Sequence, residues 1–444
     1  MSSVVDLIVT PESGEAPVVP PVPESIEEAG IPESIIEHLV LKYLYFRGEL
    51  VGRDIGALIG LPYSVIDDTL EAFKHQHYVA VKTSLGMGNM SGVFALTESG
   101  RRMAREFLEN NQYTGPAPVP LYQYTEIVRR QRHKENWLSG DILKQAFSHL
   151  VVEPDILAQL GPAVNSNKSF LIYGQPGNGK TALAEALVRV ETDPIYMPYA
   201  LECQGNIIQV YDPIYHHKVE DQPSALTGAL ADTQPHDGRW FRCRRPFIIT
   251  GGELTLDMLD LSFNKHSKVY DAPFQVKANN GIYLLDDFGR QKATPAEILN
   301  RWIVPMERHV DYLSFQAGGK MTVPFEAFLI FSTNLRPDKL GDEAFLRRIQ
   351  YKMFLRNPKA PEFTEIFVRY CEQKQILCPP DLASSFVEKH YLQAKKPFRR
   401  CHPRDVISHA VDILHFERRP IALTNEVLDR AFHSCFVENV DVID

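Results

Sequence analysis

Apolar residues recur every three or four positions through the first folded part of the chain, which is the spacing of one face of a helix. Three such segments are followed by two short runs rich in β-branched and aromatic residues, with a glycine-rich loop between the two runs. A further helical pattern opens at Thr97. The expected helices are 32–47, 50–60, 63–75 and 97–110, and the expected strands are 78–82 and 92–96.

The order helix–helix–helix–strand–loop–strand–helix resembles a winged-helix domain, here over residues 33–112. Winged helices commonly bind DNA, but this region holds eight Lys or Arg and ten Asp or Glu. The segment in the position of the recognition helix, 62–76, carries Asp67, Asp68 and Glu71 beside a single lysine. Duplex binding normally needs several cations that displace phosphate counterions. A protein-contact or dimerisation module is therefore favoured, and nucleic-acid binding is the alternative.

Two segments that are poor in core-forming residues flank this domain. Residues 1–32 are rich in proline and hold six acidic residues with no Lys or Arg. We expect a disordered acidic tail there, because such a stretch buries too little apolar surface to offset the entropy of ordering. Residues 113–124 contain the run Gly-Pro-Ala-Pro-Val-Pro, which predicts a semi-rigid linker at a domain boundary.

The rest of the chain has an alternating part and then a helical part. Strand and helix patterns alternate over 125–360, which predicts a parallel sheet between helices. Residues 361–444 read as helical, with prolines near the expected helix starts. The predicted fold class is α/β, with a C-terminal helical domain and a smaller N-terminal domain.

The strongest chemical signal is a glycine-rich loop between a predicted strand and a predicted helix. The run Gly174-Gln-Pro-Gly-Asn-Gly-Lys180-Thr181 fits G-x-x-x-x-G-K-[ST], with strand 170–173 before it and helix 182–189 after it. Such a loop wraps phosphates with backbone N–H groups at a helix N-terminus. Lys180 would contact the terminal phosphates, and the Thr181 hydroxyl would bind Mg²⁺.

Acidic and amide side chains follow two later apolar strands. The strand after Gly281 ends in Asp286-Asp287, and the strand that begins at Phe328 ends in Asn334. Buried parallel strands present their carboxyl ends along one edge of a sheet. At such an edge, Asp286 would hold Mg²⁺ through water. Asp287 would polarise the attacking water, and Asn334 would position that water.

Further along, the run Asp-Glu-Ala-Phe-Leu-Arg347-Arg348-Ile offers paired cations, and Arg404 stands at an expected helix start. These features, in this order, resemble the AAA+ ATPases over about 120–440. The resemblance implies that Asp286 and Asp287 form the Walker B pair and that Asn334 is sensor 1. Arg348 then best fits an arginine finger that acts on a neighbouring subunit, with Arg347 as the second choice, and Arg404 fits sensor 2.

The resemblance also implies the cofactors ATP and Mg²⁺. The implied metal ligands are Thr181 and Asp286, and the implied catalytic residues are Asp287, Asn334, Arg348 and Arg347. The implied nucleotide-binding residues are Gly174, Gln175, Pro176, Gly177, Asn178, Gly179, Lys180, Thr181, Ala182 and Arg404.

Two details narrow the resemblance. The second Walker B acid is usually Glu, so Asp287 is one methylene shorter than the common residue. This difference is compatible with slow hydrolysis or with a nucleotide switch.

Residues 312–324 carry Gly318-Gly319 at their centre and predict a hairpin. A hairpin before sensor 1 resembles the branch with the MoxR and magnesium-chelatase-like ATPases. Lys320 and Phe315 are candidate pore contacts there, and a plain surface hairpin is the alternative.

The expected function is an ATPase that couples turnover in a homo-oligomeric ring, commonly a hexamer, to remodelling of a protein client. The N-terminal domain would serve as the adaptor for that client. The alternatives are a DNA-associated motor or loader and an assembly factor gated by nucleotide.

Composition excludes several other classes of protein. No apolar run approaches the roughly 18 residues of a membrane span, and the N-terminus lacks the pattern of a secretory signal. The six cysteines include no C-x-x-C pair. These observations predict a cytoplasmic protein without membrane contact.

Overall fold

The computed structural model describes residues 18–84, 89–134, 137–190, 193–219, 236–341 and 343–436. The chain divides into two compact units, and each unit is assembled from separate stretches of the sequence. The first unit contains 1–134, 191–283 and 292–329, and the second contains 135–190, 284–291 and 330–444.

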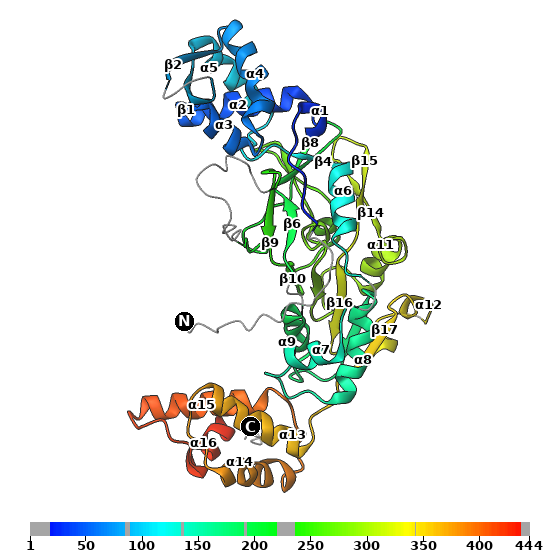
Figure 1. The fold of residues 1–444 in the computed structure, drawn as a ribbon. Coiled ribbons are helices and arrows are strands. Elements are labelled where there is room, and N and C mark those ends of the chain that lie inside the picture. Colours follow the sequence, from blue (N-terminus) through cyan, green and yellow to red (C-terminus); the bar gives the residue numbers. More distant parts are fainter. Residues whose placement is uncertain are drawn as a thin grey trace, which may run out of the picture. The chain divides into compact units, whose positions relative to one another are not determined.

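The N-terminal region of the first unit has the predicted helices and strands in the predicted order, with one additional strand, β1, where the helix over 50–60 was expected to begin (Figure 1). Its three strands form a sheet in the order β1-β3-β2. Its helices bury Ile36, Ile55 and Ile66 in one cluster with Phe94 and other apolar residues of the strands. The elements are α2 (Glu33–Arg47), β1 (Glu49–Val51), α3 (Gly52–Ile59), α4 (Tyr63–His75), β2 (Val79–Ser84), β3 (Gly92–Leu96) and α5 (Glu98–Asn110).

The prediction of a disordered tail over 1–32 is wrong for residues 18–32. Ser25 caps the short helix α1 (Ile26–Ala29) by accepting a hydrogen bond from the Glu28 N–H. Ala29 and Ile31 are buried in the same core as α2. These apolar side chains gain burial from distant parts of the chain, which composition alone does not reveal. Residues 1–17 lie outside the described part.

The predicted linker over 113–124 is also different in the structure. Tyr113, Ala117 and Val119 are buried. Strand β4 (Val119–Pro120) pairs with β7 (Ala200–Cys203) in parallel, and α6 (Leu121–Arg130) follows at once. The proline-rich run is therefore a packed element of the first unit.

The remainder of the first unit is mainly β-structure. One sheet has the order β11-β12-β8-β7-β4, and β6 pairs with β9 in antiparallel fashion. Ala200, Ile207 and Val269 of this part share a core with the N-terminal helices. The predicted single body over 125–360 is thus divided between the two units. The elements are β6 (Ile195–Pro198), β8 (Asn206–Gln209), β9 (Trp240–Cys243), β10 (Phe247–Thr250), β11 (Ser262–Asn264), β12 (Val269–Asp271), α10 (Phe274–Lys277) and α11 (Pro295–Arg308).

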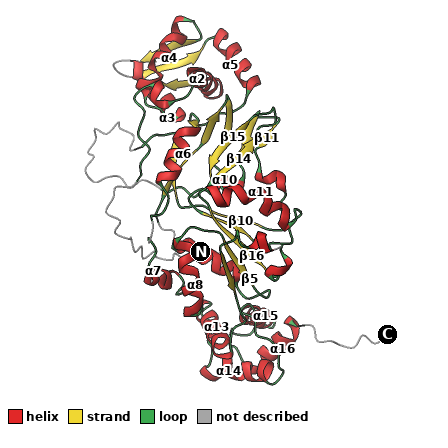
Figure 2. Cartoon of the chain, turned by 90° about the vertical axis from the view of Figure 1, so that its right-hand side faces the viewer, coloured by secondary structure: helices red, strands yellow, loops and turns green. Residues whose placement is uncertain are grey.

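The predicted hairpin is present as β14 (Val310–Ser314) and β15 (Lys320–Pro324), which are antiparallel (Figure 2). Lys320 is exposed, as a contact residue requires. Phe315 is only 5% exposed, with its ring centroid 5.2 Å from that of Tyr270. The assignment of Phe315 as a pore contact is therefore wrong, because its ring belongs to the core.

A five-stranded parallel sheet has the order β10-β13-β16-β5-β17. Strands β16 (Phe328–Thr333) and β17 (Tyr351–Phe354) pair in parallel with the two sides of β5 (Phe170–Tyr173). Strand β13 (Ile282–Leu285) is fully buried, as its four apolar residues predict. Helices of the second unit beside this sheet are α7 (Gly140–Ala146), α8 (Pro154–Asn165), α9 (Lys180–Ala186) and α12 (Glu343–Leu346).

The C-terminal part of the second unit is helical, as predicted (Figure 1). It buries its own apolar cluster, which includes Phe363, Phe386, Val406 and Leu428. Its α-helices are α13 (Ala360–Gln373), α14 (Pro380–Val387), α15 (His402–Phe416) and α16 (Asn425–Cys435). No helix in the described part of the chain is both long and apolar enough to cross a membrane.

Candidate nucleotide site

The glycine-rich loop joins β5 to α9 in the second unit, as the sequence predicts. Gly177 and Gly179 have φ of 78° and 83°, which is the left-handed region that favours glycine. A Cβ at Gly177 would lie 2.6 Å from the sulfur of Cys401, so this position has no room for a side chain. The loop therefore exposes backbone at the N-terminus of α9, where N–H groups can bind an anion.

Lys180 is buried beside this loop, with 7% of its surface exposed. Its Nζ donates to Asn334 Oδ1 at 2.6 Å and to the Gly174 and Gln175 carbonyls at 3.1 and 3.2 Å. Burial lowers the pKa of Lys180, Asp286 and Asp287 oppose that shift, and Arg399 adds to it. An anionic phosphate beside Lys180 would offset the cost of burying its charge.

Two acids face the loop from the end of β13. Thr181 Oγ1 donates to Asp286 Oδ2 at 2.8 Å, and Asn334 Nδ2 donates to Asp287 Oδ1 at 2.8 Å. Asp287 has a φ of 49°, a conformation that Asp tolerates better than most residues. One side chain, Asn334, therefore bridges Lys180 and Asp287.

The oxygens of Thr181 and Asp286 fit Mg²⁺, a hard cation that takes oxygen ligands. Within the described residues no group of three or more His, Cys, Asp or Glu could hold a metal ion by itself. A magnesium ion at these oxygens would need phosphate oxygens and water as further ligands.

These residues border one cavity of about 680 Å³ in the second unit. The lining also includes apolar and aromatic side chains, among them Leu150, Val152, Ile156 and Tyr370, which are of the kind that packs against the base of a nucleotide. The predicted site residues that line the cavity are Pro176, Gly177, Asn178, Gly179, Lys180, Thr181, Ala182, Asp286, Asp287, Asn334 and Arg404. Gly174 and Gln175 belong to the same loop and reach Lys180 through their carbonyl groups.

The predicted arginines lie in different surroundings. Arg404 lines the cavity, but its guanidinium pairs with Asp405 at 2.9 Å and its side chain is 64% exposed. Arg347 is exposed, and the Arg348 carbonyl accepts a hydrogen bond from Ser169 Oγ at 3.3 Å. Neither Arg347 nor Arg348 lines the cavity of its own chain. A role on a neighbouring subunit stays a prediction.

Sequence reasoning missed the segment just before α15. Arg400 and Cys401 line the cavity, and the Cys401 N–H donates to the Gly177 carbonyl at 2.8 Å. Arg399 Nη2 donates to Gln175 Oε1 at 3.4 Å. The available signal was the presence of three arginines, at 399, 400 and 404, within six residues of the helix start.

Comparison with known proteins adds a partial match and distant similarities. Residues 359–434 match a family profile described as a domain of unknown function, DUF8689. That match covers the helical region alone. No curated protein matches the chain in sequence.

The chain is similar to solved structures of NtrX from Brucella abortus at 12% identity and, for a complex with ATP, at 14% identity. A mutant RuvB from Thermotoga maritima is similar at 13% identity. The three matches cover 74%, 76% and 68% of this chain, each with a TM-score of 0.35. The aligned part spans 59% and 64% of the two NtrX chains and 73% of the RuvB chain. These similarities are distant, and the geometry of the cavity stands without them.

Proposed function

We propose that this protein is an ATPase of the AAA+ type that binds ATP and Mg²⁺ in the cavity of the second unit. One observation carries the proposal. The glycine-rich loop, both acids after β13 and the amide after β16 meet through the contacts Lys180–Asn334–Asp287 and Thr181–Asp286. Chance placement of these residue types would not bring three separate segments into hydrogen-bond contact.

Each side chain then has a defined task. The loop N–H groups and Lys180 bind the phosphates. Thr181 and Asp286 hold Mg²⁺, which would neutralise developing phosphate charge. Asp287 accepts a hydrogen bond from the attacking water, and Asn334 orients that carboxylate at 2.8 Å. The short reach of Asp287 favours a slow rate, because the water must approach close to the end of β13.

We infer further that ATP sites form between subunits, with Arg348 supplied by a neighbour. The exposure of Arg347 and the half-buried position of Arg348 leave this segment at the surface of the chain. Mixing inactive Lys180→Ala and Arg348→Ala chains should then restore part of the turnover. A mixture that stays inactive would count against a shared site.

We also propose a protein client for the N-terminal region, rather than duplex DNA. Helix α4 exposes Asp68, and Asp67 and Glu71 are half-buried on the same helix. Tyr63 donates to Asp67, and Lys74 pairs with Glu71 at 2.7 Å, so the helix offers no excess of positive charge. Stimulation of turnover by duplex DNA that is lost as salt rises would favour the DNA-associated alternative instead.

Steady-state phosphate release tests the core of the proposal. Wild-type chain should release phosphate from ATP only with Mg²⁺ present, and Asp287→Asn should bind ATP without turnover. Normal turnover by Asp287→Asn would remove Asp287 from the catalytic role.

A further inference from the structure

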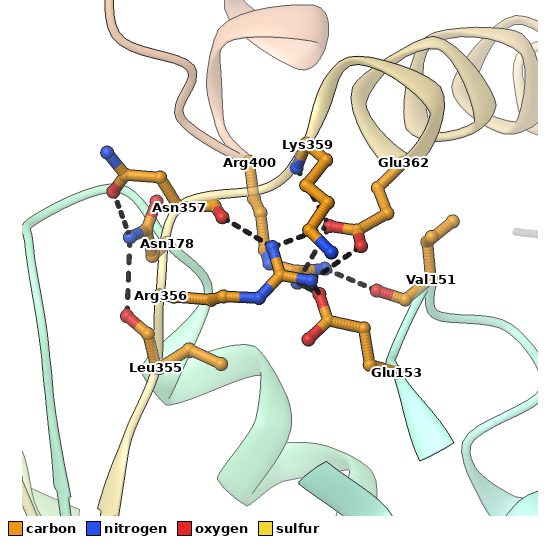
Figure 3. Close-up of polar contacts among 9 residues, drawn as sticks. All are labelled: Val151, Glu153, Asn178, Leu355, Arg356, Asn357, Lys359, Glu362 and Arg400. Atoms are coloured by element: carbon orange, nitrogen blue, oxygen red, sulfur yellow. Dashed lines mark hydrogen bonds and ion pairs between the residues drawn. The ribbon is translucent and has the colours of Figure 1, made fainter. Parts of the chain in front are cut away.

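Residues 355–359 connect strand β17 to helix α13, and they touch both the glycine-rich loop and the helical region. Asn357 Oδ1 accepts a hydrogen bond from Asn178 Nδ2 at 2.8 Å and a second, short one from Arg399 Nη1. Asn178 also donates to the Leu355 carbonyl at 3.5 Å (Figure 3). A single amide oxygen therefore joins the glycine-rich loop to the segment before α15.

The neighbouring residue, Arg356, holds a second group of contacts. Its guanidinium donates to Glu362 at the start of α13 at 2.7 Å and pairs with Glu153 before α8 at 2.5 Å. Arg400 pairs with the same Glu153 at 3.3 Å and donates to the Val151 carbonyl (Figure 3). Burial would raise the pKa of Glu362, but the bonds from Arg356 and the Lys359 N–H lower it to about 2, so this carboxylate stays charged.

The segment before α15 also touches the loop directly. Arg399 donates to Gln175, and the Cys401 N–H donates to the Gly177 carbonyl, while the Cys401 sulfur occupies the space that a Cβ at Gly177 would need. Gln175, Gly177 and Asn178 belong to the part of the glycine-rich loop that would surround the phosphates. The loop is therefore in direct hydrogen-bond contact with residues 357, 399 and 401.

The oxygen of Asn357 has two acceptor sites, and both are used. Asn178 is fully buried, so loss of the acceptor would leave its N–H₂ group with only the long bond to Leu355. Arg399 and Lys180 are two positive charges that act on each other across the loop. A polyphosphate would reduce that repulsion and favour the arrangement that Asn357 holds.

We propose that Asn357 is a positioning residue that couples phosphate occupancy of the glycine-rich loop to the placement of residues 399–404. The proposal rests on the proposed function, because the phosphate is that of ATP bound in the cavity. Arg356 supports Asn357 by fixing the connecting segment to Glu362 of α13 and to Glu153, which directly follows the cavity-lining residues Val151 and Val152.

Substitutions at position 357 separate the amide oxygen from the volume of the side chain. Asn357→Leu removes both hydrogen bonds at similar size. Asn357→Asp keeps an oxygen acceptor for both partners, and Asn357→Ser is a milder loss if the leucine variant does not fold. Arg430→Ala is the matched control, because Arg430 pairs with Glu417 on the surface of the same helical region and does not line the cavity.

Two measurements on the full chain test the proposal. The first is the affinity for a fluorescent ATP analogue and for the corresponding ADP analogue. The second is hydrogen exchange of residues 399–404 with and without ATP and Mg²⁺. We expect Asn357→Leu to weaken ATP binding by about tenfold and to lose the ATP-dependent protection of 399–404. Asn357→Asp should retain both properties within about threefold of wild type, as should Arg430→Ala.

The outcomes separate the two proposals. Wild-type protection by ATP that survives unchanged in Asn357→Leu and Asn357→Ser would overturn the role of Asn357 and leave the ATPase proposal standing. Protection lost equally in Asn357→Leu and Asn357→Asp would also overturn it, because the acceptor would not be the cause. Failure of wild-type chain to bind ATP would overturn the proposed function and this inference together.

Discussion

The two units of the molecule each contain a cluster of Arg with acidic residues, and the clusters differ in exposure and surroundings. In the first unit, Asp237 and Arg239 are 2% and 1% exposed and pair at 2.7 Å. Arg239 also donates to the Ala29 carbonyl at 2.7 Å and to Gln123 at 3.2 Å. This pair joins three parts of the first unit, and neither Asp237 nor Arg239 lines the cavity described above.

In the second unit, the side chains of Arg356, Glu153, Glu362 and Arg400 are between 11% and 33% exposed. Arg400 lines the nucleotide cavity, and the cluster adjoins the connecting segment before α13. A fully buried pair loses much when one partner is removed, whereas partly exposed charges exchange partners at lower cost. The same residue types therefore form a fixed buried pair in the first unit and a partly exposed cluster, able to exchange partners, in the second.

The largest expected effect is on the second unit and follows from Lys180→Ala. The substitution removes the buried ammonium that contacts Asn334 and the loop carbonyls. We expect ATP affinity to fall by at least about a hundredfold, with little change in the thermal stability of the first unit. Titration calorimetry with ATP and Mg²⁺ measures the affinity. Unchanged affinity would mean that the cavity is not the ATP site.

Asp287→Asn should affect turnover alone. The amide keeps the size of the side chain but no longer accepts a proton from water, so we expect turnover to fall by roughly a thousandfold at unchanged ATP affinity. Single-turnover phosphate release measures this step. Asp286→Asn is the contrasting variant, and it should weaken the dependence on Mg²⁺ because Asp286 is the predicted metal ligand.

Arg239→Ala should destabilise the first unit without affecting the cavity of the second unit. It would leave Asp237 buried without its partner, which costs about 3–5 kcal/mol of unfolding free energy. Arg53→Ala is the matched control, since Arg53 and Asp54 are 69% and 53% exposed and their pair contributes little. Denaturant unfolding of both variants gives the two values, and equal losses would contradict the contrast drawn between exposed and buried pairs.

A smaller effect is expected from Glu326, a buried carboxyl group of the first unit. Burial raises its pKa to about 7, although Arg132 at 3.0 Å and Arg129 oppose the shift. The folded state therefore binds more protons than the unfolded state between about pH 4.5 and 7. Stability should fall as pH rises through this window, by about 3 kcal/mol.

Glu326→Gln isolates that contribution. The variant cannot ionise, so the difference in unfolding free energy between wild type and variant should carry the dependence on pH. His309, whose pKa is lowered by burial and by Arg132, is present in both proteins. Parallel stability curves from pH 5 to pH 8 would show that Glu326 does not titrate in this range.

Local signals in the sequence explain which features were predictable. Helix α11 begins at Pro295 because Thr294 and Glu297 form a capping box and Pro295 occupies the first turn, both of which are visible in the sequence. The glycine-rich loop and Asp286-Asp287 carry their own spacing and flanking strands. These features depend on neighbours within a few residues, which the sequence displays directly.

Contacts between distant residues explain what could not be predicted. Asn357 meets Asn178 across 179 positions of the chain, and Arg239 meets Ala29 across 210 positions. The burial of Ala29 and Ile31 depends on helices that the composition of the N-terminal segment does not reveal. Nothing in the sequence indicates where the chain passes from one unit to the other. Each boundary falls within or beside a strand or a loop, not at a linker with a distinct composition.

The most direct test of the account is steady-state phosphate release from ATP by the full chain, with Mg²⁺ and with a chelator, beside the Lys180→Ala variant. The account predicts turnover that requires Mg²⁺ and is absent in Lys180→Ala. Absence of turnover and of ATP binding in the wild-type chain, or equal turnover in Lys180→Ala, would contradict it.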